Sequence, residues 1–132
     1  MSLWWQQFFL VMAGGSLGAV GRFLIGGWVT RHVGTGFPWG TLTANLIGAF
    51  AAGFLLIWLE SRGPSALLWR AFLVVGLLGG LTTFSALMLE SLIFSRGGRI
   101  DQLVIYLAVS LACGFALVWL GARLAESLRP IA

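Results

Sequence analysis

Four long apolar stretches constrain this chain more than any other feature. They cover residues 5–29, 39–59, 68–94 and 103–124. A membrane-spanning helix needs about 20 consecutive, mostly apolar residues, and each stretch reaches that length. The connections between them are short, so they leave no room for a separate soluble domain. The sequence therefore predicts one all-α integral membrane domain over residues 1–132, with four transmembrane helices.

The composition agrees with a membrane protein. Apolar residues make up 59% of the chain and charged residues 9%, with a mean hydropathy of +0.98. A soluble domain has about 25% charged residues, so this surface suits hydrocarbon better than water. The net charge is +4, but all eight basic residues are arginines that flank the apolar stretches without forming a basic run. We therefore expect the lipid bilayer, and no nucleic acid, as a partner.

Candidate catalytic and metal-binding groups are scarce. The one Cys, Cys113, lies within the fourth stretch, and the one His, His32, lies in a loop. No Cys/His metal cluster and no nucleophile–His–acid set can form within the membrane. We expect that the protein is not an enzyme and has no organic cofactor.

The arginines are distributed evenly about the membrane. With four spans, both termini share one side with the connection between the second and third spans. That side carries Arg62, Arg70, Arg123 and Arg129, and the other carries Arg22, Arg31, Arg96 and Arg99. Because arginines in short loops set the orientation, this balance predicts insertion both ways up and an antiparallel dimer with a second copy of the chain. Placing Arg22 inside the first helix would leave four against three, and thus a weak bias.

Glycines at helical spacing indicate close helix packing. Gly14 and Gly18 lie four residues apart in the first span, and Gly48 precedes Ala52 by four residues in the second. Small residues allow the backbones of membrane helices to approach closely. We interpret Gly14, Gly18 and Gly48 as packing residues.

The third span contains a weak point. Gly79 and Gly80 are adjacent, at a cost of about 1 kcal/mol each relative to Ala in a helix, and Thr82 and Thr83 follow directly. We expect a break here, with the freed backbone groups satisfied by protein, water or an ion. The alternative is a continuous helix whose Thr hydroxyls bond back to the preceding turn.

Polar side chains form one narrow stripe on each of three spans. The stripes are Thr41, Asn45 and Gly48; Thr82, Thr83 and Ser85 around Phe84; and Tyr106, Ser110 and Gly114. They fit either a lined path or interhelical hydrogen bonds. We expect no ionisable side chain near a span centre, since Glu60 and Glu90 lie towards span ends. Neutral donors and aromatic ring edges suit a small anion, because they replace its hydration without holding it too tightly.

Three motifs together resemble a known family. Residues 14–23 read GGSLGAVGRF, residues 39–48 read WGTLTANLIG, and residues 76–85 read GLLGGLTTFS. In this order and at these spacings, they resemble the Fluc (CrcB) family of dual-topology fluoride channels. The similarity extends over nearly the whole chain.

The resemblance implies a passive fluoride channel in the inner (plasma) membrane of a prokaryote, exporting fluoride down its electrochemical gradient. It implies an antiparallel homodimer or heterodimer with two pores and a central structural sodium ion. The sodium ligands would be the main-chain carbonyls of Gly79 and Thr82, Arg22 would end the first helix near a vestibule, and Glu90 would face the membrane. The fluoride pore would include Thr41, Asn45, Thr83, Phe84, Ser85, Tyr106 and Ser110.

The chain departs from this family at four positions. The family usually continues the third motif as TTFSTFS, whereas residues 82–88 here read TTFSALM. Leu87 replaces a second Phe, Ala86 and Met88 replace hydroxyl residues, and Gly114 replaces a second Ser often seen on the fourth helix. Because Leu has no positive ring edge, we expect altered conduction or selectivity.

Two other functions remain open at this point. A dual-topology carrier of the small multidrug resistance type would also have four short helices, but it needs a carboxylate in the first helix, and residues 5–29 contain none. A membrane scaffold subunit that transports nothing is the other alternative.

Overall fold

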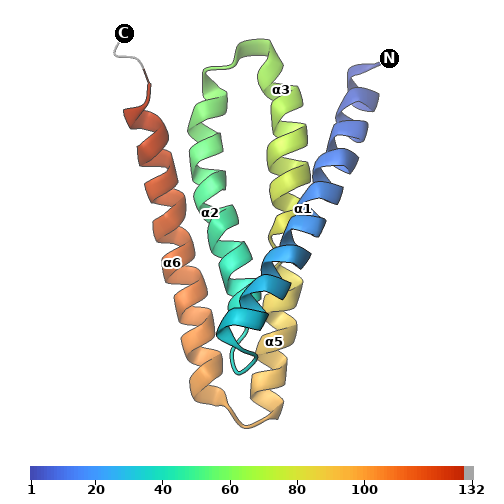
Figure 1. The fold of residues 1–132 in the computed structure, drawn as a ribbon. Coiled ribbons are helices and arrows are strands. Elements are labelled where there is room, and N and C mark those ends of the chain that lie inside the picture. Colours follow the sequence, from blue (N-terminus) through green and yellow to red (C-terminus); the bar gives the residue numbers. More distant parts are fainter. Residues whose placement is uncertain (130–132) are drawn as a thin grey trace.

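The structure is a computed structural model that describes residues 1–129, and these residues are helical apart from short connections (Figure 1). The first, second and fourth spans are single helices, and the third consists of five consecutive pieces. The bounds are α1 Leu3–Val33, α2 Trp39–Glu60, η1 Gly63–Ser65, α3 Ala66–Trp69, η2 Arg70–Leu78, α4 Gly79–Leu81, α5 Phe84–Arg96 and α6 Ile100–Ser127.

The four predicted spans are confirmed. Within the described part of the chain, four helical segments are long and apolar enough to cross a membrane, namely Leu3–Val33, Trp39–Glu60, Gly63–Arg96 and Ile100–Ser127. Large apolar side chains face outward along them; Phe23 and Phe115 are each 78% exposed. Such a surface is stable in hydrocarbon and not in water.

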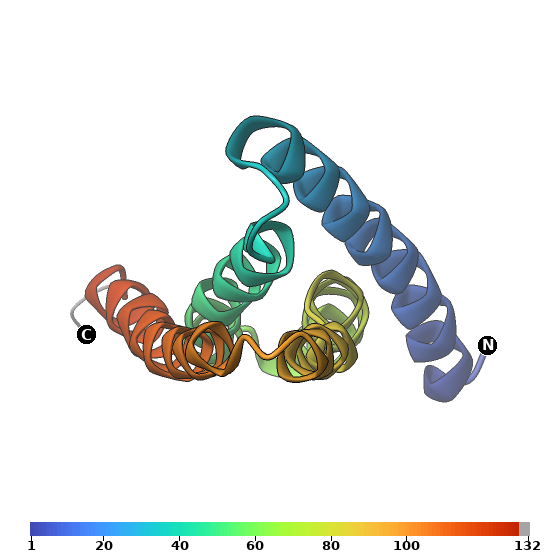
Figure 2. The same cartoon turned by 90° about the horizontal axis from the view of Figure 1, so that it is seen from below.

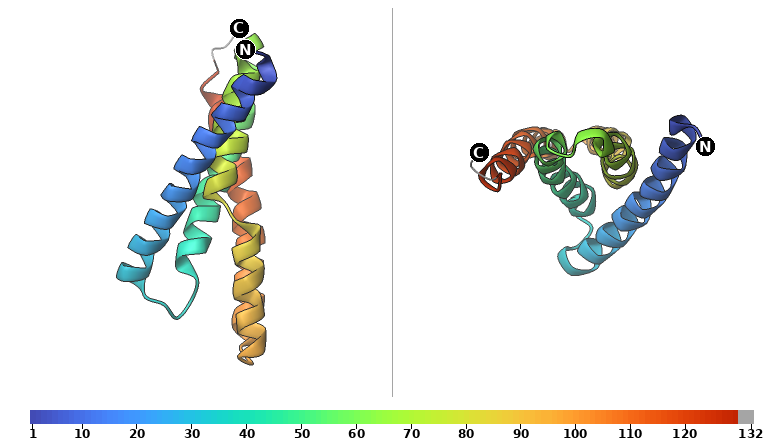
Figure 3. Two further views of the ribbon diagram at one scale, coloured as in Figure 1. Left: turned by 90° about the vertical axis from the view of Figure 1, so that its right-hand side faces the viewer. Right: turned by 90° about the horizontal axis from the view of Figure 1, so that it is seen from above.

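The chain runs up and down four times. The N-terminus and the connection between α2 and α3 lie at one end of the molecule, together with the end of α6 (Figure 1). The α1–α2 loop and the α5–α6 corner lie at the opposite end. α6 runs alongside α2, and α1 crosses the third span obliquely, so the helices do not form a square bundle (Figures 2 and 3).

The first and third spans cross at glycines, where the backbones almost touch. A Cβ atom added to Gly14 would lie 2.2 Å from the carbonyl oxygen of Phe72, and one added to Gly18 would lie 2.0 Å from that of Leu77. No side chain fits in these positions. Both glycines therefore lie at the contact that positions the third span.

Two further glycine contacts join α2 to its neighbours. A Cβ atom on Gly48 would lie 2.1 Å from Cγ2 of Thr82, so this glycine faces the third span. A Cβ atom on Gly53 would lie 1.9 Å from the carbonyl oxygen of Val118, and one on Gly121 would lie 2.1 Å from that of Phe50. The sequence did not single out the Gly53 and Gly121 contacts, through which α2 packs on α6.

The third span is interrupted in the predicted stretch, at the threonines that follow the glycines. Gly79–Leu81 is helical, whereas Thr82 (φ −89°, ψ 155°) and Thr83 (φ −150°, ψ 114°) are extended. Gly80 is needed for packing, because a Cβ atom there would lie 2.4 Å from the carbonyl oxygen of Gly15 on α1. The β-branched threonines, which favour extended backbone, form the break.

A second irregularity precedes the break. Residues Arg70–Leu78 form a π-helix of 9 residues. Such segments are rare and usually short, and nothing in the sequence pattern predicted this one.

Candidate functional site

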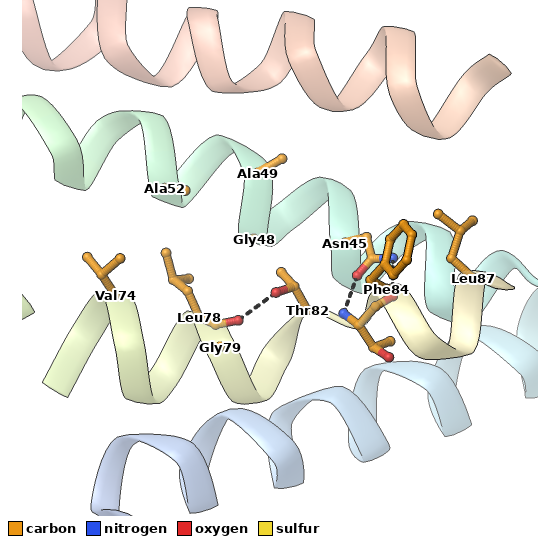
Figure 4. A pocket seen from close by; sticks show the side chains of 11 residues that line it. Asn45, Gly48, Ala49, Ala52, Val74, Leu78, Gly79, Thr82, Phe84 and Leu87 are labelled. Atoms are coloured by element: carbon orange, nitrogen blue, oxygen red, sulfur yellow. Dashed lines mark hydrogen bonds between the residues drawn. The ribbon is translucent and has the colours of Figure 1, made fainter. Parts of the chain in front are cut away.

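The break is held open by one side chain from α2. The backbone N–H of Thr83 donates to Oδ1 of Asn45 at 2.7 Å, and Nδ2 of Asn45 donates to the carbonyl oxygen of Thr83 at 3.1 Å (Figure 4). The amide thus pairs with the extended residue as a neighbouring strand would. Its second N–H remains available for another acceptor.

The break leaves the four carbonyl groups of residues 79–82 without their helical donors, and the cause is explicit for the first and the last of them. In a continuous helix, the N–H of Thr83 would bond to Gly79 and the N–H of Ala86 would bond to Thr82. Instead, Thr83 donates to Asn45, and the N–H of Ala86 donates to Oγ1 of Thr83 at 3.1 Å. The carbonyl oxygens of Gly79 and Thr82 are therefore free to accept other donors or a cation.

A cavity of about 450 Å³ lies between α2 and the third span at this point. Gly79 and Thr82 line it together with Asn45, Phe84 and Leu87 (Figure 4). The structure thus brings both predicted sodium ligands to the same wall as three predicted pore residues, Asn45, Thr83 and Phe84.

Arg22 does not lie at the end of the first helix. α1 continues to Val33, and Nε of the partly buried Arg22 donates to the carbonyl oxygen of Gly80 at 3.1 Å. Arg22 therefore lies within a membrane span, next to the break. The expectation that no ionisable side chain lies near a span centre is wrong at this position. It also leaves four arginines at one end of the molecule and three at the other.

Glu90 joins the polar cluster and does not face the membrane. Oγ1 of Thr41 donates to one carboxylate oxygen at 2.6 Å, and the hydroxyl of Tyr106 donates to the other at 2.5 Å. Glu90 lies on the face of α5 that also carries the buried Leu87 and Phe94. Leu87 lies three residues before Glu90, and Phe94 lies four residues after it. This helical spacing could have placed Glu90 on the inward face from the sequence alone.

Ser110 carries an unmatched polar atom. It lies one turn from Tyr106 on α6, and its Oγ is buried without a hydrogen-bond partner among the described residues. A buried hydroxyl without a partner costs free energy, so it points to a ligand or water that would accept its hydrogen bond.

The remaining predicted pore residues do not join this cluster within one chain. Phe84 is 73% exposed, and Ser85 is exposed with its hydroxyl 3.2 Å from that of Thr83. Leu87 is buried in a cluster with Tyr106 and Leu42. Leu87, which stands where the family usually has a second Phe, therefore belongs both to the hydrophobic core and to the cavity wall.

Comparison with known proteins identifies the family. The family model described as "CrcB-like protein, Camphor Resistance (CrcB)" matches residues 9–122. This chain belongs to the CrcB-like family. The resemblance inferred from the three motifs is thereby confirmed.

Several curated relatives of this CrcB-like chain carry the name "Fluoride-specific ion channel FluC". One from Xanthomonas euvesicatoria pv. vesicatoria is 58% identical over 121 residues, which are 92% of this chain and 91% of that protein. One from Thermus thermophilus is 42% identical over 123 residues, 93% of this chain and 96% of that protein. One from Caulobacter vibrioides is 39% identical over 122 residues, 92% and 96% of the two chains.

These relatives are bacterial and are named as channels. Together with the four spans, they identify a multi-pass membrane protein of a prokaryote. They also confirm that the chain belongs to a family of ion channels and not of enzymes.

Proposed function

We propose that this chain forms a passive, fluoride-selective channel that exports fluoride down its electrochemical gradient. The observation that carries the proposal is the buried hydroxyl of Ser110, which has no protein partner and lies one turn from the Tyr106–Glu90–Thr41 cluster. The names of the relatives supply the identity of the ion.

The path would be lined by neutral donors. Ser110 offers its hydroxyl, and Asn45 offers the amide hydrogen that Thr83 does not use. Thr41 and Tyr106, whose hydroxyls donate to Glu90, would extend this path towards the α1–α2 loop without offering a further donor, and Phe84 would present a ring edge to it. Hydrogen bonds to such groups can replace the hydration shell of a small anion while leaving it free to move on.

The carbonyls at the break fit a structural sodium ion. Gly79 and Thr82 have lost their helical donors to Asn45 and Thr83, and oxygen ligands suit hard cations. No cluster of three or more His, Cys, Asp or Glu side chains occurs among residues 1–129. When bound, sodium would add a fixed positive charge beside the path and join two copies of the chain.

The partner would be a second copy in the opposite orientation. Two observations support this arrangement: the nearly even arginine count, and the exposure of Phe84 beside a cavity that one chain does not close. Two pores per dimer would follow from the two-fold symmetry. The inside-negative potential of a prokaryotic plasma membrane would drive the anion outward.

A flux assay tests the proposal. Purified protein is reconstituted into liposomes loaded with fluoride or chloride, and efflux is followed with an ion-selective electrode, with sodium or with a bulky organic cation. We expect rapid fluoride efflux, little chloride efflux, and loss of activity after prolonged sodium removal. Absence of fluoride efflux, or equal chloride efflux, would overturn the proposal.

The same assay separates the two alternatives. Asn45→Ala should abolish efflux in a channel, whereas a scaffold would show no efflux in either form. A proton-coupled carrier would respond to an imposed pH gradient. The described α1 contains no carboxylate that could couple to one.

A further inference from the structure

A second cavity opens at the end of the molecule that holds the α1–α2 loop. It has a volume of about 290 Å³, and its walls include Thr35, Gly36, Phe94, Glu90 and Arg99. Thr35, Gly36 and Arg99 are exposed, whereas Glu90 is partly buried. The cavity therefore leads from the surface to the carboxylate that Thr41 and Tyr106 contact.

Arg99 lies at the rim of this cavity without a carboxylate partner in the described part of the chain. Its guanidinium donates to the carbonyl oxygen of Gly36 at 2.8 Å and to the side-chain oxygen of Gln102, and it lies 4.8 Å from the ring centre of Phe94. All three groups are neutral, and no carboxylate of residues 1–129 lies within 4.0 Å of Arg99.

Two other arginines differ in this respect, whereas the remaining ones also lack a carboxylate partner among residues 1–129 but do not line this cavity together with Glu90. Arg129 lies 2.6 Å from the carboxylate of Glu60, and Arg123 lies 3.4 Å from that of Glu126, both at the opposite end of the molecule. Their fields are reduced by their partners. No such partner among the described residues reduces the field of Arg99. The hydrogen bonds of its guanidinium to Gly36 and Gln102 hold this charge in one place.

The inner wall carries the opposite charge. Both carboxylate oxygens of Glu90 accept hydrogen bonds from neutral hydroxyls, and no basic side chain of the described residues pairs with it. An anion approaching Tyr106 from this end would be repelled by Glu90. A fixed positive charge at the rim of the same cavity opposes that repulsion.

We propose that this cavity is a mouth of the anion path and that Arg99 is the residue that attracts fluoride into it by offsetting the field of Glu90. The inference rests on the proposed channel function. Arg99 acts through the potential in the mouth and does not bind the ion in the pore.

The test compares Arg99→Gln and Arg99→Lys with Arg96→Gln. Arg96 is an exposed arginine of the last turn of α5 at the same end, but it does not line the cavity. Initial fluoride efflux is measured at low and high concentrations of an impermeant salt, with sodium constant. Since salt screens charges over about 10 Å at 0.1 M, we expect Arg99→Gln to lower efflux about fivefold at low salt. At high salt the loss should fall below about twofold, while Arg99→Lys and Arg96→Gln remain near wild type at both salt concentrations.

A double variant distinguishes attraction from a structural tether to Gly36. In a Glu90→Gln background, Arg99→Gln should have a smaller effect, because no carboxylate remains to be offset. A deficit that neither salt nor Glu90→Gln reduces, with a lowered melting temperature, would assign Arg99 to loop stability and overturn the inference. Equal effects of Arg99→Gln and Arg96→Gln would also overturn it. Absence of wild-type fluoride efflux would instead overturn the channel proposal itself.

Discussion

At the scale of single residues, two side chains reroute the backbone hydrogen bonds of the third span. Asn45 takes the N–H that Gly79 would have received, and Thr83 takes the N–H that Thr82 would have received. Each exchange satisfies one donor and releases one carbonyl. Carbonyls that have lost their helical donors in a membrane are costly unless something compensates them, and an ion at this break could do so.

At Ser110, a role in the pore can be separated by experiment from a role in helix packing. Because its Oγ has no partner within the chain, Ser110→Ala should not lower the melting temperature in detergent and is expected to raise it slightly. Fluoride efflux from liposomes should nevertheless fall at least about tenfold, the effect of losing about 1.4 kcal/mol of stabilisation of the ion.

The control for Ser110→Ala is Cys113→Ala, an exposed position on the same helix. It should change neither quantity. A Ser110→Ala variant that melts earlier and conducts normally would show that the hydroxyl serves packing and not the ion.

At the scale of helices, backbone contact at glycines decides how α1 lies against the third span. Gly14 and Gly18 touch the carbonyls of Phe72 and Leu77, and Gly80 touches α1 in return. Lipid supplies no hydrophobic force to hold helices together, so this contact depends on close packing. It also explains why the break comes after Gly80 and not at it.

Gly18→Ala should therefore destabilise the protein. The added Cβ atom would lie 2.0 Å from the carbonyl oxygen of Leu77, so α1 has to move away. We expect a loss of about 2 kcal/mol or more, a typical cost of overpacking, measured as a lower melting temperature by fluorescence-detected size exclusion.

Gly114 provides the matched control. A Cβ atom there would meet nothing within 4 Å, and the residue lies within α6. Gly114→Ala should be neutral or stabilise by up to about 1 kcal/mol, the difference in helix propensity. Equal melting temperatures for the two variants would contradict a tight α1 contact.

At the scale of the whole molecule, the arginines favour neither orientation strongly. Arg62, Arg70, Arg123 and Arg129 lie at the end with the termini. With Arg22 placed inside α1, Arg31, Arg96 and Arg99 remain at the other end. A difference of one arginine gives a weak bias. The proposed antiparallel dimer depends on this near balance.

Orientation can be measured directly. In a Cys113→Ala background, a Ser61→Cys variant places one thiol in the connection between α2 and α3. An impermeant maleimide added to intact cells should label between about a third and two thirds of the chains, since the arginine bias is weak. Ser127→Arg, which adds one arginine at the same end, should shift that fraction clearly. Labelling of all or none of the Ser61→Cys chains would rule out dual topology.

The sequence alone determined the fold class, the four spans and the family, because these depend on apolar length and on motifs that are continuous in the chain. It also predicted that the third span breaks near Thr82. The tertiary structure decided where each polar group lies: Arg22 on the carbonyl of Gly80, Glu90 between Thr41 and Tyr106, and Arg99 across the mouth on Gly36. Each of these contacts joins residues at least 16 positions apart, and their geometry follows from how closely glycines allow the helices to approach, which no local pattern specifies.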